Sequence, residues 1–321
     1  MRINHALISL GIVTAVYLGL LVWLDGERGV FALLPTLASA MPVLLILTVA
    51  SWLLRYARWC WLLRLAGYPL TGWRSLAAYL AGFAFTATPG KVGELVRIRY
   101  YGNQDVPAEA VVAAFVFERM LDLVAVLLLA FLGWGAFGGI YTTLLVFVTV
   151  IVAAVLACAF YPVLLHATGD RLAAWSMPRL AAIMRTVCAG VVGLRQWLTV
   201  GRVLVSLLFG LAAWGVMAGA FAWLLSELSI DLPWQQALAI YPAAMLAGAA
   251  SMLPGGLGST EAVIIALLGD QGVALALASL AAVGIRLATL WFAIVVGLIA
   301  VIRLESHDRA HAKRRDSSSP A

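Results

Sequence analysis

Three ionisable side chains stand within one helical turn of a long apolar run. Glu118, Arg119 and Asp122 lie near the middle of residues 108–134. A charge at the centre of a bilayer costs about 2.5–3.5 kcal/mol, so this group needs partners or water. Asp122 follows Arg119 by three residues and Glu118 by four, so one helix face brings it beside both. The group is either an internal network that only locks a helix bundle, or the wall of a polar cavity where Arg119 meets an anionic group.

A second arginine, Arg286, lies deep in the apolar run 273–302 and has no acid in its own helical neighbourhood. Glu261 precedes it by 25 residues and is its expected partner. Glu94 precedes Arg119 by the same 25 residues and is expected to be the counterpart there. Arg286 either helps to bind an anion or pairs with Glu261 only to attach one segment to its neighbour.

Two further apolar stretches are interrupted by Pro and Gly. Residues 76–88 are too short to cross a bilayer, and residues 234–253 stop at a Pro-Gly-Gly. Each is expected to be the first arm of a re-entrant hairpin that returns through residues 91–101 or 259–268. Such turns at membrane depth are tolerated only inside protein or beside a water-filled cavity. The expected turn residues are Pro89, Gly90, Gly93, Pro254, Gly255, Gly256 and Gly258.

The return segments begin with free backbone N–H groups, at Gly93-Glu94 and at Gly258-Ser259. These helix starts could face an anionic headgroup. Ser259 is expected to cap the second return helix, with Glu261 in its first turn.

The two hairpins also repeat. Pro89, Gly90 and Gly93 recur as Pro254, Gly255 and Gly258, each offset by 165 residues. The helices that precede the hairpins are expected to run in opposite directions, which makes residues 37–134 and 203–302 an inverted repeat. That arrangement places transporter binding sites between the repeats, near the midplane.

The whole chain has the composition of a membrane protein. Hydrophobic residues make up 64% of 321 residues, and charged residues only 11%, against about 25% in soluble proteins. This balance excludes a soluble enzyme. We expect an all-α polytopic protein with one membrane domain over residues 1–302, containing two oppositely oriented re-entrant hairpins and six full spans. The spans are residues 6–24, 37–54, 108–134, 141–165, 203–225 and 273–302.

The distribution of basic residues predicts the orientation. With both termini in the cytoplasm, the basic loops, including Arg55 and Arg58, fall on the cytoplasmic side. Residues 166–202 mix basic and apolar side chains, which favours a helix in the cytoplasmic interface over a solvated linker. Residues 303–321 are polar and basic and are expected to form a disordered tail.

Several functions lack their motifs. Gly90-Lys91 is followed by Val92 rather than Ser or Thr, so no nucleotide motor is expected. The four histidines lie at the termini or at a helix end, and the scattered basic residues form no nucleic-acid stripe, so no metal, cofactor or nucleic acid is expected. Asp25 and Glu27 could hold the metal of an intramembrane lipid or lipid-sugar transferase, although their loop is short.

Three motifs in order resemble the flippase-like transmembrane region of lysylphosphatidylglycerol synthases. They are Thr88-Pro89-Gly90-Lys91-Val92-Gly93-Glu94-x-x-Arg97, Phe117-Glu118-Arg119-x-x-Asp122 and Leu253-Pro254-Gly255-Gly256-Leu257-Gly258-x-x-Glu261. Stand-alone relatives of that region include bacterial inner-membrane proteins, one of them associated with hopanoids. The resemblance implies lipid translocation, with Glu118, Arg119 and the hairpin residues, Glu94, Arg97 and Glu261 among them, as the site.

No aminoacyl-transferase domain follows the last predicted span, so lipid lysylation is not expected, and no catalytic residue is assigned. The leading hypothesis is a lipid translocase of the bacterial inner membrane that lacks its own nucleotide motor. Its partners would be membrane lipids with an anionic or lipid-linked headgroup. The alternatives are the transferase and a non-transporting scaffold for lipid-biosynthetic enzymes.

Overall fold

The structure is a computed structural model and describes residues 34–160 and 193–317. In these two ranges the chain is helical and contains no strand. The predicted span at residues 6–24 and most of the predicted interfacial segment at 166–202 lie outside them. The longer helices are α2 (Leu34–Leu65), α3 (Gly72–Ala81), α5 (Ala108–Ala130), α6 (Gly139–Phe160), α9 (Val200–Glu227), α10 (Trp234–Ala250), α11 (Ser259–Asp270), α12 (Leu275–Arg286) and α13 (Phe292–Ser317).

Three helical stretches in the described ranges are long and apolar enough to cross a membrane, namely Pro35–Leu65, Val200–Glu227 and Leu275–Asp308. The third joins α12 and α13 through a π-helical turn, Leu287–Trp291, so the predicted last span is one long helix. Helix α5 carries Glu118, Arg119 and Asp122, and these charges lower its mean hydropathy. Helix α6 reaches Phe160, where the first described range ends. The chain is therefore a helical membrane protein, as its composition predicts.

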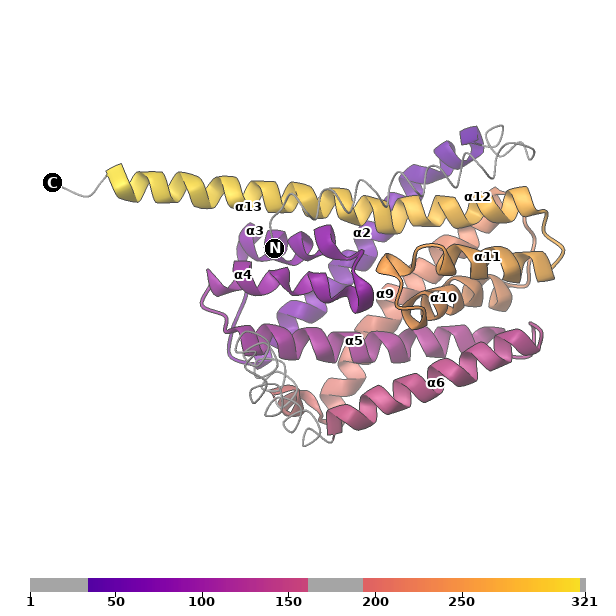
Figure 1. The fold of residues 1–321 in the computed structure, drawn as a ribbon, viewed down its shortest axis with the longest axis horizontal. Coiled ribbons are helices and arrows are strands. Elements are labelled where there is room, and N and C mark those ends of the chain that lie inside the picture. Colours follow the sequence, from indigo (N-terminus) through magenta and orange to yellow (C-terminus); the bar gives the residue numbers. More distant parts are fainter. Residues whose placement is uncertain (1–33, 161–192, 318–321) are drawn as a thin grey trace, which may run out of the picture.

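At both Pro-Gly sequences the chain turns back on itself and forms a helical hairpin. In the first, α3 and a short 3₁₀ turn (Gly82–Phe85) lead to the turn segment η3 (Pro89–Val96) and back through α4 (Arg97–Gly102). In the second, α10 leads to the turn η6 (Pro254–Gly256) and back through α11. Figure 1 shows the two antiparallel hairpins with their turns directed toward each other at the centre of the molecule. A Cβ added to Gly255 would lie 3.4 Å from Ala87 Cα, so the turns touch.

Long helices flank this central pair of hairpins. The continuous α12–α13 helix runs beside both hairpins, and α5 lies along their other side (Figure 1). Glycine permits the close approach of α13 to the first hairpin, because a Cβ at Gly297 would lie 2.1 Å from Ala84 N. Helices α2 and α9 cross behind and contact each other.

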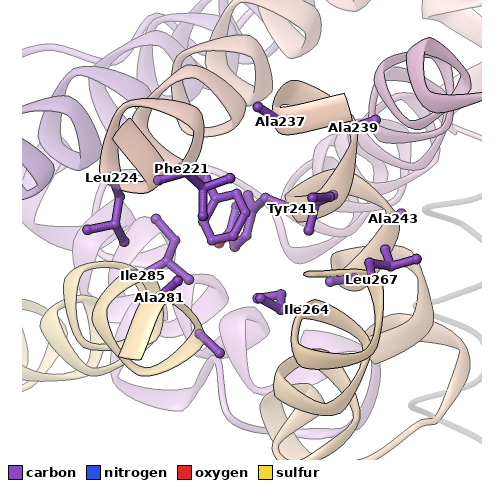
Figure 2. Packing of buried hydrophobic residues seen from close by; sticks show 14 of the residues in the cluster. Phe221, Leu224, Ala237, Ala239, Tyr241, Ala243, Ile264, Leu267, Ala281 and Ile285 are labelled. Carbon is purple, nitrogen blue, oxygen red and sulfur yellow. The ribbon is translucent and has the colours of Figure 1, made fainter. Parts of the chain in front are cut away.

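Each hairpin has its own apolar core. In the core of the second, Phe221 of α9 stacks on Tyr241 of α10 at 5.8 Å between ring centroids, with Ile264 of α11 and Ile285 of α12 close by (Figure 2). The core of the first is centred on Trp59, which is fully buried and stacks on Tyr101. The polar site described below lies between these two cores.

Large apolar side chains also cover much of the outer surface. Ile46 of α2, Leu208 of α9 and Ile302 of α13 are each more than 60% exposed. In a soluble protein such a surface would drive association, whereas acyl chains solvate it in a bilayer.

The prediction of disorder from residue 303 is wrong over residues 303–317, because α13 continues as a helix through Ser317. Its polar end is attached to the first hairpin. Glu305 pairs with Arg99 at 2.9 Å, and Asp308 pairs with Arg74 at 2.8 Å. Composition alone did not reveal these partners, which lie about 200 residues away in sequence.

Candidate functional site

A buried charge cluster is centred on α5, where three arginines share two carboxylates. Arg58 Nη2 lies 2.9 Å from Glu118 Oε1 and 2.6 Å from Asp122 Oδ1. Arg119 Nη2 lies 3.1 Å from Asp122 Oδ2, which confirms the predicted local pair, and 3.5 Å from Glu118. Arg55 completes the cluster at 3.6 Å from Asp122. One positive charge in the cluster is therefore left without a carboxylate of its own.

Arg55 and Arg58 correct the expectation that they lie in a cytoplasmic loop. Helix α2 continues to Leu65 and carries both into the protein, where Arg58 is fully buried and Arg55 is nearly so. Two features of the sequence could have predicted this. Arg55 and Arg58 are three residues apart, and the apolar run Trp59–Leu63 follows them, so both features indicate that the helix continues.

Glu94 is not the ion-pair partner of Arg119, contrary to the prediction from the 25-residue spacing. It pairs with Arg97 at 3.1 Å and accepts a hydrogen bond from Thr86 Oγ1 at 3.1 Å. The Arg97 guanidinium lies 4.0 Å above the Tyr79 ring and donates to Tyr79 O. Arg97 is 1% exposed. The contacts of Arg97 with Tyr79 fasten the return arm of the first hairpin to α3, and they hold Arg97 beside Glu94.

The predicted pair of Glu261 and Arg286 is present, with Oε1 and Nε 2.8 Å apart. Arg286 Nη2 also donates to Gly255 O at 2.6 Å, so the arginine holds the turn of the second hairpin. Glu261 Oε2 accepts from Gly258 N at 2.8 Å. The N-cap of α11 is therefore Gly258 rather than the predicted Ser259, which is the first helical residue and donates to Gly256 O.

Between the hairpin turns lies a small cavity of about 80 Å³, which we call the polar chamber. Arg119 and Arg286, from the two halves of the chain, both line it, as do Lys91 and Glu94. The Arg119 side chain is 19% exposed and lines the chamber, whereas Arg286 is almost fully buried at its wall. Other lining residues include Thr48, Arg55, Tyr79, Thr86, Trp214, Tyr241 and Thr289.

A second and larger cavity of about 350 Å³, the apolar groove, adjoins the chamber. It is bounded by α5, α6, α9, α10 and the tips of both hairpins, and most of its wall is apolar. Met252 and Leu253 at this tip are 60% and 46% exposed. Five residues line both cavities, namely Lys91, Arg119, Trp214, Met245 and Gly255.

The candidate residues therefore separate into groups. Arg119, Arg286, Glu94 and Gly255 line the chamber, and Asp122, Gly90, Gly255 and Gly256 line the groove. Glu118, Arg97, Glu261, Pro89, Gly93, Pro254 and Gly258 line neither of these two cavities. Their contacts hold the lining residues in place.

Several buried polar atoms at the cavities have no hydrogen-bond partner, among them Thr48 Oγ1, Trp214 Nε1 and Arg119 Nε. A buried donor without a partner costs free energy unless a ligand or water satisfies it, so these atoms favour a polar occupant. Within residues 34–160 and 193–317 no three His, Cys, Asp or Glu side chains gather as metal ligands, and Asp25 and Glu27 lie outside those ranges.

Comparison with known proteins gives one match. Residues 7–297 match the family described as the lysylphosphatidylglycerol synthase TM region. Comparisons with curated proteins and with solved structures gave no match. Because the match covers nearly the whole chain, this protein belongs to the lysylphosphatidylglycerol synthase TM region family.

Proposed function

We propose that this protein moves a lipid with an anionic headgroup between the leaflets of a bacterial cytoplasmic membrane, without a nucleotide motor of its own. The observation that carries the proposal is the junction of the polar chamber with the apolar groove. Arg119 stands at that junction and Arg286 at the chamber wall. Family membership supports a lipid-related role in the membrane.

The two cavities match the two parts of an amphiphile. A headgroup in the chamber would meet the surplus positive charge of the α5 cluster and the unpaired donors of Trp214 and Thr48. The acyl chains would lie in the groove, against Leu123, Val126 and Val148. A lipid could thus keep its chains in an apolar environment while its headgroup crosses the membrane interior.

Movement between leaflets requires the chamber to open to each side in turn. We infer that residues 37–134 and 203–302 form an inverted repeat whose halves rock about the contact between the hairpin turns. The junction of Gly255 with Ala87 would be the moving contact, because it joins the two halves. Both termini would lie in the cytoplasm, and the substrate would be selected by its headgroup charge.

The test uses Arg119, because the α5 cluster has one arginine in excess. Arg119→Gln leaves Arg55 and Arg58 facing Glu118 and Asp122, so the buried charges balance and the fold is retained. In proteoliposomes that contain a headgroup-labelled anionic lipid, this variant should lose most transbilayer movement. Arg99→Gln removes an arginine whose side chain is 64% exposed and outside both cavities, and should move lipid at the wild-type rate.

The outcomes separate the alternatives. Equal rates for wild type and Arg119→Gln would reject the site. A wild-type protein that moves no lipid but yields a modified lipid in a metal-dependent reaction, lost in Asp25→Asn, would favour the transferase. Function that survives replacement of the intramembrane charges by apolar residues would favour the scaffold.

A further inference from the structure

The backbone of Lys91 has a left-handed conformation, which residues with a side chain rarely adopt. Its φ and ψ are 56° and 23°, in the left-handed region, and Gly90 before it has φ 61°. The equivalent turn of the second hairpin uses Gly255 and Gly256, with φ 62° and 64°. Lys91 therefore stands where the other hairpin has glycine, and such strain is retained at sites where the side chain has a function.

The second hairpin could not carry a lysine at this point. A Cβ at Gly256 would lie 2.8 Å from Thr260 Oγ1 and 3.0 Å from Gly248 Cα, so the tip is closed by a tight glycine contact. Lys91 has a half-buried side chain that lines both the chamber and the groove. The two hairpin tips therefore differ at this position: the second has Gly256 in a tight contact, and the first has the positively charged Lys91.

The Lys91 ammonium has no carboxylate partner among residues 34–160 and 193–317. Every buried acid around the chamber is already held by arginine, with Glu94 on Arg97, Glu261 on Arg286, and Asp122 and Glu118 on Arg58. The Lys91 Nζ lies 5.9 Å from the centroid of the Trp214 ring. A partly desolvated ammonium without a counter-ion requires an anion or water.

The position of Lys91 indicates which part of a lipid it meets. Lys91 and Arg119 are the two cations that line both cavities. Trp214 lines both as well, and its Nε1 is buried without an acceptor. In a phospholipid or a polyprenyl phosphate, the group between the polar head and the hydrocarbon is a phosphate. Three donors at the polar–apolar junction therefore match a phosphate rather than a charge farther out on the headgroup.

We propose that the substrate is a lipid phosphate, and that Lys91 binds its phosphate together with Arg119 and Trp214 at the junction of the two cavities. This proposal rests on the proposed function and specifies the substrate class of the same site. The rest of the headgroup would extend into the chamber toward Glu94 and Tyr241.

The experiment measures lipid binding to the full-length protein by native mass spectrometry, separately from transport. Dioleoyl phosphatidylglycerol is compared with dioleoylglycerol hemisuccinate, which has the same chains and charge but carries a carboxylate farther from the chains. Glycerol phosphate, which has no chains, is the third probe. Wild type should prefer the phospholipid and bind glycerol phosphate weakly.

Lys91→Gln should weaken phospholipid binding about tenfold, the loss expected for one charged hydrogen bond, and leave hemisuccinate binding unchanged. Lys91→Arg should retain binding, because it keeps the charge. Lys91→Gly should lose binding as Lys91→Gln does, yet unfold at the same or a higher temperature, because glycine relieves the left-handed strain. This combination separates a binding role from a structural one.

Equal phospholipid binding by wild type and Lys91→Gln would overturn the assignment, and so would equal losses for both lipids. Glycerol phosphate bound as tightly as the phospholipid would show a site for free phosphate esters and reject the lipid. If Lys91→Gln fails these tests while Arg119→Gln still abolishes transport, only this inference falls. If binding behaves as expected but Arg119→Gln transports normally, the proposed function falls.

Discussion

Arg58 donates to Asp122 Oδ1 at 2.6 Å, and this pair joins α2 to α5 at the bottom of the charge cluster. Arg58 is fully enclosed and also donates to Glu118, whereas Arg119, on the other side of the same acids, faces the chamber. The two arginines thus contact the same carboxylates but have different roles. We propose that Arg58 balances the buried acids and that Arg119 is left to bind a ligand.

Stability should therefore respond very differently to the two arginines. Arg58→Gln removes the closest cation from two buried carboxylates and should lower the free energy of unfolding by about 3–5 kcal/mol. Arg119→Gln should cost less than this, because Arg55 and Arg58 still face the two carboxylates. Denaturant unfolding in detergent micelles measures both. A larger loss for Arg119→Gln than for Arg58→Gln would contradict this division of roles.

At the tip of the second hairpin, a second substitution should restore the stability that a first one removes. A Cβ at Gly248 would lie 2.2 Å from Thr260 Oγ1, a buried hydroxyl without a hydrogen-bond partner. Gly248→Ala alone should cost about 1–3 kcal/mol of stability by overpacking. Adding Thr260→Ala removes the clash, since the Thr260 Cβ is 3.6 Å away, and should restore stability.

Gly219→Ala is the matched control for that pair, because Gly219 is also helical and has no atom within 4 Å of an added Cβ. It should stabilise the protein by about 0.5–1 kcal/mol through helix propensity alone. A Gly248→Ala variant as stable as this control, or a double variant no better than the single, would show that α10 and α11 do not meet as closely as described.

The polar end of α13 should be protected from amide hydrogen exchange only while its ion pairs with the first hairpin are present. Replacing Glu305 by Gln and Asp308 by Asn removes the partners of Arg99 and Arg74. Amide hydrogen exchange at residues 304–308 should then become about twofold to thirtyfold faster, since the two exposed pairs contribute about 0.2–1 kcal/mol each. Glu227→Gln is the control, at an acid remote from α13. Exchange at coil rates in the wild type would restore the prediction of a disordered tail.

The sequence predicts the helices and hairpins well because both arise from local chemistry. Long apolar runs form α2, α9 and the α12–α13 helix, and Pro-Gly turns form the hairpin tips. The pairing of Arg286 with Glu261 also follows, because Glu261 begins the return arm of the neighbouring hairpin and Arg286 has no acid near it on its own helix. In these cases the structural feature depends on one segment of the chain or on one nearby partner.

What the sequence could not predict depends on where distant segments meet. The spacing rule paired Glu94 with Arg119, but Arg97 on the same turn is nearer and fastened by Tyr79. Arg58 resembled a loop charge until the length of α2 placed it beside Asp122. The adjoining cavities, and the strained backbone of Lys91, arise from packing between the two hairpins, which leaves no pattern along the chain.

The central claim is that one lipid fills the chamber and the groove together, and photo-crosslinking in liposomes tests it most directly. An anionic phospholipid with a photoreactive group midway along one acyl chain should label groove residues, which mass spectrometry would locate among Leu123, Val126, Val148, Leu246 and Met252. Labelling there should fall at least about tenfold in Arg119→Gln, the loss of one charged contact. Labelling of the outward-facing Ile46 and Ile302 should not change. Equal labelling of groove and outer surface, unaffected by Arg119→Gln, would contradict the account.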